Sequence, residues 1–224
     1  MNYQKFIESK RFNQIQSGFD PKITCDQLFD YQKDIVTWAC RRGKAAIFAD
    51  TGLGKTLMQI TWADQVNKET NKPVLILAPL AVKEQTIKEG IKFGFNMENI
   101  HVNNYDQIHN IDCSIYSGIV LDESSILKGE SSKTRKKLNK AFKNTPYKLS
   151  CTATPSPNDY MELGTQSEFL DVMSQVEMLA MFFIHDGNDT SKWRLKGHGK
   201  KKFFEWMATW SIFISKPPDR DWET

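Results

Sequence analysis

The stretch that decides the fold is Ala45-Ala46-Ile47-Phe48-Ala49-Asp50-Thr51-Gly52-Leu53-Gly54-Lys55-Thr56. A short apolar run is followed by a glycine-containing turn and then by a helix-like segment, the order of a buried strand, a phosphate loop and a helix N-terminus. Gly52 and Gly54 permit backbone conformations that a Cβ would obstruct, so several N–H groups can point at one anion. Lys55 can then reach the β- and γ-phosphates of a nucleotide, and the Thr56 hydroxyl can ligate Mg²⁺.

The loop fits a known pattern: Gly or Ala, four residues of any kind, Gly, Lys, and then Ser or Thr. Ala49 rather than glycine takes the first place. The alternative interpretation is a glycine turn beside an exposed lysine. The apolar run before the loop and the helical segment after it favour a nucleotide site.

Length and composition set wide limits. With 224 residues the chain can form one large domain, or one domain with an appendage. The apolar content of 40% and the charged content of 25% are ordinary for a soluble globular protein. A net charge of +3 permits a polyanionic partner without requiring one. Residues 1–6 lack an apolar signal core and no run approaches the ~20 apolar residues that cross a bilayer, so no membrane partner is expected.

The cysteines and histidines predict no metal or disulfide chemistry. The cysteines form no Cys-x-x-Cys pair, so we interpret them as small buried residues in a reducing cytosol and expect a cytoplasmic protein. The histidines show no metal-ligand spacing. The residues are Cys25, Cys40, Cys113 and Cys151, and His101, His109, His185 and His198.

Strand-like and helix-like segments alternate through the first two thirds of the chain. A helix with apolar positions from Leu28 to Ala39 is expected to end near Gly43. After the first strand, apolar runs predict strands near residues 74–78, 100–102, 118–121 and 147–151. This alternation predicts an α/β domain of three layers with a mostly parallel central sheet, in which ligands gather beyond the carboxyl ends of the strands.

An acidic pair, Asp122-Glu123, stands at the end of one of these strands. Opposite a phosphate loop, Asp122 would hold the metal ion and Glu123 would polarise the attacking water. The alternative is a solvated turn, since acidic residues end many strands. A phosphate loop and a buried strand in the same chain favour the catalytic interpretation.

The pattern changes beyond about residue 156, where the chain reads as helical and aromatic with no further strand-then-helix repeat. Phe203, Trp206, Met207, Trp210 and Phe213 fall at helical spacing, which predicts a packed face. Two basic groups are harder to interpret. The cluster Lys200, Lys201 and Lys202 is either a solvated loop or a loop that follows phosphates, and the run Lys133, Arg135, Lys136, Lys137 and Lys140 is interpreted as a solvated helix face.

Three of these stretches together resemble motifs I, II and III of superfamily 2 helicases, particularly the Swi/Snf-like branch and the compact helicases of bacteriophages. They are Asp50–Thr56, Asp122-Glu123-Ser124-Ser125 and Thr152-Ala153-Thr154-Pro155. Leu77-Ala78-Pro79-Leu80 resembles motif Ia, and Asn104-Tyr105-Asp106 resembles motif Ib. Phe29-Asp30-Tyr31-Gln32 resembles the upstream glutamine motif. The matches run from about residue 28 to 157 in the order of the family, which is more specific than any single motif.

The resemblance implies a role for each matching residue. Gln32 would recognise adenine, although a glutamine on a helix surface is the alternative. Lys55, Asp122 and Glu123 would be catalytic, with Asp122 and Thr56 holding Mg²⁺. The nucleotide would be bound by Gln32, Thr51, Gly52, Leu53, Gly54, Lys55 and Thr56. Thr152 and Thr154 would couple the state of the γ-phosphate to the nucleic-acid path, unless they are an ordinary exit from a strand. Pro79 and Tyr105 stand where relatives touch a nucleic-acid backbone, unless they only end strands.

The resemblance also implies a domain organisation, with departures from the family pattern. It gives a lead-in at residues 1–27, a RecA-like ATP-binding lobe at 28–160 and a helical, basic and aromatic extension at 161–224. Motors of this family have a second RecA-like lobe that supplies arginine fingers, and no second phosphate-site-like α/β lobe is expected to fit after residue 160. Ser124 and Ser125 replace the third and fourth letters of the DEAD and DEAH versions of motif II.

We therefore expect the N-terminal motor lobe of an ATP-dependent DNA helicase or translocase that uses ATP and Mg²⁺. Its partners would be duplex DNA and a second lobe in the same or another chain. It would be located in the cytoplasm, which is that of the host if a phage encodes it. Because arginine fingers contribute about 10³–10⁵ in rate, the lobe alone would hydrolyse ATP very slowly. One alternative is a non-catalytic, nucleotide-gated module that binds nucleic acid and acts through a partner chain. Another is a phosphotransferase, which Thr152-Ala153-Thr154-Pro155 after the acidic pair argues against.

Overall fold

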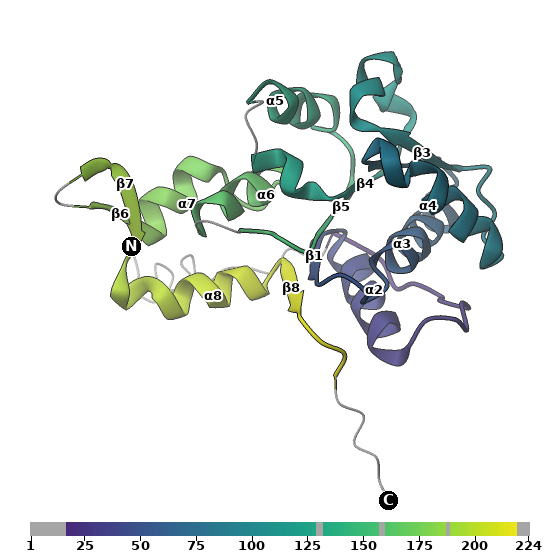
Figure 1. Ribbon diagram of the computed structural model, residues 1–224, viewed down its shortest axis with the longest axis horizontal. Helices are drawn as coiled ribbons and strands as arrows, with labels where there is room; N and C mark the ends of the chain where they lie inside the picture. Colours follow the sequence, from purple (N-terminus) through teal and green to yellow (C-terminus); the bar gives the residue numbers. More distant parts are fainter. Residues whose placement is uncertain (1–16, 129–131, 157–159, 187–188, 219–224) are drawn as a thin grey trace, which may run out of the picture.

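The computed structural model describes residues 17–128, 132–156, 160–186 and 189–218. Its centre is a sheet of six strands in the order β3-β2-β4-β5-β1-β8, in which every neighbouring pair is parallel (Figure 1). The strands are β1 (Lys44–Ala49), β2 (Val74–Ala78), β3 (Ile100–Asn104), β4 (Gly118–Asp122), β5 (Tyr147–Thr152) and β8 (Ser211–Ile214). The prediction of an α/β fold with a mostly parallel sheet is confirmed.

Helices cover both faces of this sheet, which makes the three layers. Alternate residues of a strand point to opposite faces, and so Ala45, Ile47 and Ala49 join one core while Ala46 and Phe48 join the other. The first core is closed by α2 (Asp30–Arg42), α3 (Lys55–Thr70) and α4 (Leu80–Lys92). The second is closed by α5 (Ser132–Ala141), α6 (Leu163–Phe169), α7 (Gln175–Phe182), α8 (Lys200–Ala208) and short 3₁₀ turns. In Figure 1, α2, α3 and α4 lie to the right of the sheet and α6, α7 and α8 to its left.

The predicted end of the first helix is confirmed, and the predicted burial of the cysteines holds for two of the four. Helix α2 ends at Gly43, which has the positive φ of 74° that glycine adopts most easily. Cys40 and Cys151 are buried and Cys25 and Cys113 are half-buried, all four with free thiols. Burial raises the pKa of the Cys40 thiol to about 12, so it behaves as a small apolar residue. Within the described part of the chain, no helix combines the length and apolar character needed to cross a bilayer.

The end of the chain corrects one prediction. Residues 161–224 were expected to be helical, yet β8 completes the sheet beside β1, and β6 (Phe183–Asp186) pairs with β7 (Asp189–Leu195) as an antiparallel hairpin. Phe203, Trp206, Met207 and Trp210 are buried as expected, because they face the second core from α8 and the turn after it. Phe213 does not belong to that stripe. It lies on β8 and is 55% exposed, because the helix ends at Ala208.

The start of the chain packs on the first core. Phe19 meets the ring of Tyr147 edge-on at 5.5 Å, and its backbone N–H donates to the Cys40 carbonyl. The predicted lead-in at 1–27 therefore ends against the sheet domain. Its residues 1–16, and residues 219–224 of the predicted extension, lie outside the described residues. The boundaries at 28–160 and 161–224 remain predictions.

A buried lysine ties the turn after α6 to the sheet. Lys148 of β5 is only 1% exposed, and its Nζ donates to the Phe169 carbonyl at 3.0 Å and to Asp171 Oδ2 at 2.7 Å. Lys44 of β1 donates to the same carboxylate oxygen at 2.7 Å. Burial lowers the pKa of Lys148, and the hydrogen bond from Lys148 to Asp171 acts in the opposite direction. The carboxylate of Asp171 thus compensates a buried cation.

Replacing Asp171 by Asn is expected to destabilise the chain by about 3 kcal/mol, because it leaves the buried Lys148 without a counter-charge. Asparagine keeps the size of the side chain and tolerates the positive φ of 54° at this position. Urea unfolding would measure the change. Adding Lys148→Met to Asp171→Asn should recover most of the loss, and an unchanged midpoint for Asp171→Asn alone would contradict this account of the contact.

Candidate nucleotide-binding site

The sheet brings the three predicted motifs to one edge. Strand β5 lies between β1 and β4, and the register aligns Phe48 with Thr152 and Asp122 with Cys151. Because these strands are parallel, their carboxyl ends lie together, and the segments that follow them meet there. The phosphate loop follows β1, the acidic pair ends β4, and Thr152 ends β5 between them.

The phosphate loop has the features of an anion site. Gly52 and Gly54 adopt positive φ angles of 87° and 75°. Helix α3 starts directly afterwards with no side-chain cap and no acidic residue in its first turn, so no side chain competes for its first N–H groups. Thr51 and Gly52 are exposed, Leu53 is buried and Thr56 is half-buried. The loop and the helix end therefore fit a phosphate group.

Lys55 lies across the mouth of the loop. Its Nζ donates to the Ala49 carbonyl at 2.7 Å and to the Asp50 carbonyl at 3.1 Å. The ammonium group is thus held over the loop by two backbone oxygens. These are contacts that a phosphate oxygen can replace.

Gln32 of α2 forms a hydrogen bond with the phosphate loop. It is only 3% exposed; its Oε1 accepts from the Phe29 N–H at 2.9 Å and its Nε2 donates to the Leu53 carbonyl at 2.9 Å. The Tyr31 hydroxyl reaches the same carbonyl at 3.4 Å. The structure thus gives Gln32 a contact with the phosphate loop, and recognition of adenine remains a prediction.

A methyl group at Gly54 is expected to disturb this contact more than one at Gly52. Both residues have a positive φ, so alanine strains the backbone by about 1–2 kcal/mol at either position. A Cβ at Gly54 would also overlap Gln32 Nε2, whereas a Cβ at Gly52 would meet nothing within 4 Å. Thermal unfolding should therefore show a lower Tm for Gly54→Ala than for Gly52→Ala. Equal values would show that Gln32 does not fix the loop.

Asp122 ends β4 and is half-buried. Its Oδ1 accepts a hydrogen bond from Gln59 Nε2 at 2.7 Å, and its backbone carbonyl accepts one from the Tyr105 hydroxyl at 2.6 Å. Burial raises the pKa of the carboxyl group; the Gln59 hydrogen bond and the positive charge of Lys55 lower it, and the charge of Glu123 raises it. The loop after β1 and the acidic pair after β4 lie at the same edge of the sheet.

The donor set around Asp122 suits a magnesium–nucleotide complex rather than a metal site made by the protein alone. No three His, Cys, Asp or Glu side chains within the described ranges gather where they could hold a metal ion. Mg²⁺ in nucleotide sites takes only one or two protein ligands and completes its shell with phosphates and water. One carboxylate beside an anion-binding loop meets that requirement.

Asp122→Asn is expected to raise the Tm by about 2–4 °C while weakening Mg²⁺-dependent nucleotide binding. A carboxyl group whose pKa is raised by folding favours the folded state at acid pH and opposes it above both pKa values. At neutral pH the neutral amide removes that penalty. The Tm difference between the variant and the parent chain should shrink as the pH falls toward the folded-state pKa. A difference that does not change with pH would contradict the assignment.

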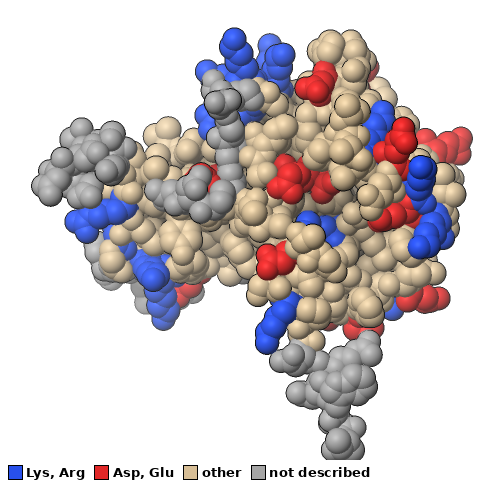
Figure 2. Space-filling model, in the orientation of Figure 1, with Lys and Arg blue, Asp and Glu red and all other residues tan. Residues whose placement is uncertain are grey.

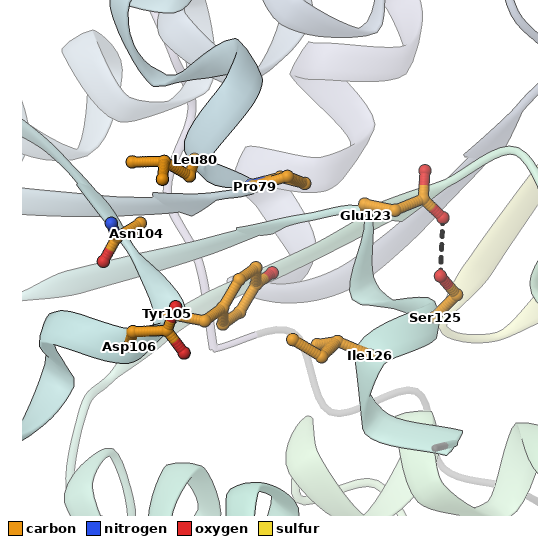
Figure 3. Close-up of a pocket in the computed structure, with 8 residues that line it drawn as sticks. All are labelled: Pro79, Leu80, Asn104, Tyr105, Asp106, Glu123, Ser125 and Ile126. Atoms are coloured by element: carbon orange, nitrogen blue, oxygen red, sulfur yellow. Dashed lines mark hydrogen bonds between the residues drawn. The ribbon is translucent and has the colours of Figure 1, made fainter. Parts of the chain in front are cut away.

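Glu123 has an uncommon backbone conformation. Its φ is 55°. Within the described ranges, two other residues that are not glycine have a positive φ, Asn71 and Asp171. Asn and Asp tolerate this conformation better than Glu does. Oε1 of Glu123 accepts hydrogen bonds from the Ser125 and Thr152 hydroxyls, each at 2.6 Å. The other carboxylate oxygen points away from Ser125 (Figure 3). Backbone strain of this kind is typical of functional sites.

The predicted coupling residues form a chain of contacts with Glu123. Thr152 is fully buried, and its Oγ1 donates to Glu123 while it accepts the Thr154 N–H at 3.0 Å. The structure thus links motif II to motif III through one hydroxyl group. Their role in coupling stays a prediction.

A cavity of about 380 Å³ adjoins Glu123 and brings together motifs Ia, Ib and II. Pro79, Leu80, Tyr105 and Ile126 are among the residues that line it, and Figure 3 shows them around one open space. Tyr105 is 8% exposed and its hydroxyl is engaged by Asp122, so its ring acts as a wall of the cavity. Pro79 and Tyr105 therefore lie together, and their contact with nucleic acid remains a prediction.

Lys200, Lys201 and Lys202 lie elsewhere. They are exposed in the first turn of α8, with Lys201 Nζ 3.9 Å from Glu205. Helix α8 runs from the outer end of the molecule toward β8, so this cluster lies at the end of α8 that points away from the sheet (Figure 1). The structure does not bring it to the nucleotide site.

Two glutamines contribute to the site that the motifs did not reveal. Gln59 is fully buried one helical turn after Lys55 and holds Asp122, and Gln166 of α6 donates to the Ser124 carbonyl at 2.8 Å. The signal for Gln59 was a polar residue four positions after Lys55 in a mostly apolar helix. Gln166 gave no such signal, because its partner is 42 residues away in the sequence.

No protein-family model and no curated protein matches the sequence. Solved structures do match. The SWI2/SNF2 ATPase core of Sulfolobus solfataricus, solved in complex with dsDNA, aligns with a TM-score of 0.72 and 21% identity over 89% of this chain and 47% of that one. The UvsW helicase of bacteriophage T4 aligns with a TM-score of 0.54 and 14% identity over 72% of this chain and 65% of that one. The Hef helicase domain of Pyrococcus furiosus aligns with a TM-score of 0.57 and 20% identity over 68% of this chain and 39% of that one.

The chain has the fold of part of these helicase and ATPase cores. The resemblance to superfamily 2 helicases, and to the Swi/Snf-like branch among them, is thus confirmed at the level of the fold. The chain spans about half of the Sulfolobus core, at 47% of its length. This RecA-like lobe carries the phosphate loop and the acidic pair on adjoining segments of one sheet edge.

Proposed function

We propose that this chain is the ATP-binding lobe of an ATP-dependent DNA helicase or translocase, and that it hydrolyses ATP when a second lobe completes the site. The observation that carries the proposal is that the phosphate loop follows β1 and Asp122-Glu123 follows β4, two parallel strands whose carboxyl ends lie at one edge of the sheet. Few other functions require an anion-binding loop and an acidic pair in this arrangement.

The residues of the site would divide the work as follows. The N–H groups of the phosphate loop and the first turn of α3 would bind phosphate, and Lys55 would exchange its two carbonyl contacts for phosphate oxygens. Thr56 and Asp122 would hold Mg²⁺, which neutralises phosphate charge when bound. Glu123, held at one oxygen by Ser125 and Thr152, would use its other oxygen to orient a water molecule and accept its proton.

Duplex DNA is the proposed polymer. The Sulfolobus SWI2/SNF2 core, to whose fold this chain is similar, was solved with dsDNA. The cavity that joins motifs Ia, Ib and II, lined by Pro79 and Tyr105, is the proposed place where the polymer approaches the acidic pair.

Phosphate release from Mg·ATP, measured with and without duplex DNA, tests the proposal. The chain alone should bind Mg·ATP and release phosphate very slowly. The same chain joined to a second RecA-like lobe should gain about 10³-fold or more and respond to DNA. Binding of nucleotide and DNA with no turnover in the two-lobed protein would favour a nucleotide-gated binding module instead.

A further inference from the structure

Helix α5 carries a stripe of four lysines with no acidic residue among them. Lys133, Lys136, Lys137 and Lys140 stand at positions i, i+3, i+4 and i+7, so all four lie on one face of the helix. All four are exposed, and the opposite face buries Leu138 in the second core. Figure 2 shows the basic atoms gathered over α5 at the top of the view.

The stripe differs from two lysines on other helices that lie beside an acidic residue. On α3, Lys68 pairs with Asp64 at 2.7 Å, and on α8, Lys201 approaches Glu205. Helix α5 has no acidic residue at all, and within the described part of the chain no carboxylate pairs with its four exposed lysines. A solvated helix face commonly mixes both signs, which this one does not.

The positions of these lysines destabilise helix α5. Lys133 with Lys137, and Lys136 with Lys140, are like charges one turn apart, which destabilises a helix. Lys133 also stands in the first turn, where the helix dipole disfavours a cation. A polyanion bound along the stripe would relieve both effects.

The stripe belongs to the part of the molecule that carries the acidic pair. Helix α5 contacts the 3₁₀ turn η3 (Ser124–Lys128), which follows Glu123 directly. Ser125 and Ile126 of that turn line the cavity beside Pro79 and Tyr105. The stripe is about 10 Å long, similar to the rise of about three base pairs of duplex DNA.

We propose that Lys133, Lys136, Lys137 and Lys140 form a contact surface for the phosphate backbone of duplex DNA. The proposal rests on the proposed function, since it names a surface by which the same lobe holds its polymer. It assigns a role to a run that the sequence pattern alone suggested to be a solvated face. The contact is with phosphates, so it carries no sequence preference.

Salt-dependent binding of a fluorescently labelled DNA duplex tests this surface. Replacing the four lysines by glutamine should weaken binding by about tenfold or more and reduce the slope of log K against log salt by about 3–4. A matched variant replaces four exposed lysines on the side of the sheet that α3 and α4 cover: Lys22, Lys72, Lys88 and Lys92. That variant has the same net charge and should keep the affinity within about twofold and the slope unchanged.

Thermal unfolding separates loss of the contact from loss of the fold. The α5 variant should unfold at the same temperature as the parent chain or higher, because like-charge repulsion is removed. The proposal is overturned if the α5 variant binds the duplex as the parent does, if the control variant loses as much, or if the parent shows no duplex binding. It is also overturned if the four lysines matter only for binding to anionic phosphatidylserine vesicles. Mg·ATP binding, measured on the same samples, reports on the proposed function independently.

Discussion

Lys55→Ala is expected to weaken binding of Mg·ATP by about 100-fold or more. The ammonium group is held over the phosphate loop by the Ala49 and Asp50 carbonyls, and alanine removes the charged donor that would replace these contacts with phosphate oxygens. Charge-assisted hydrogen bonds contribute about 1.5–3 kcal/mol each, so loss of two removes about 3 kcal/mol at least. Isothermal titration calorimetry with ATP and Mg²⁺ would measure the change.

Lys68→Ala on the same helix is the matched control. Lys68 pairs with Asp64 at the far end of α3, so its loss removes an equal charge without touching the loop. Its nucleotide affinity should remain within about twofold of the parent value, because surface ion pairs contribute little. If Lys55→Ala binds Mg·ATP as the parent does, the phosphate-loop assignment is wrong.

Glu123→Gln is expected to slow ATP hydrolysis by about 10²–10⁴-fold in a protein that carries both lobes. Glutamine keeps the size of the side chain and can still accept hydrogen bonds from Ser125 and Thr152, but it cannot accept a proton from water. Nucleotide binding should therefore persist while turnover falls. Phosphate release and calorimetric binding, measured on the same preparation, would separate these two effects.

The control for this prediction is Glu69→Gln, at an exposed position near the end of α3. It should leave both binding and hydrolysis unchanged. Hydrolysis by Glu123→Gln at the parent rate would refute the role of Glu123 as the water activator. Loss of binding together with hydrolysis would instead show that Glu123 maintains the structure of the site.

The parts of the site that could be predicted from sequence are those whose chemistry is local. The phosphate loop needs Gly52, Gly54, Lys55 and Thr56 in one contiguous turn, so a short pattern contains nearly all the information. The acidic pair ends an apolar run, and parallel strands bring such ends together without further detail. The order of strands and helices up to residue 152 was predicted closely, because the apolar runs and turns that define it are also local features of the sequence.

The parts that could not be predicted depend on contacts between distant residues. Strand β8 is only four residues long and follows an aromatic helix, so the spacing placed Phe213 in the helical stripe. Its pairing with β1 makes this segment a strand instead. Lys148 gave no sign of burial, because its partner Asp171 is 23 residues away. The hold of Gln32 on the Leu53 carbonyl likewise depends on how α2 packs against the loop.

A crystal structure of this chain with Mg²⁺ and a non-hydrolysable ATP analogue tests the central claim most directly. The account predicts the phosphates against the first turn of α3, Lys55 Nζ turned from the Ala49 and Asp50 carbonyls to phosphate oxygens, and the metal ion between Thr56 and Asp122. A nucleotide bound at another place, with Lys55 still donating to the two carbonyls, would contradict it.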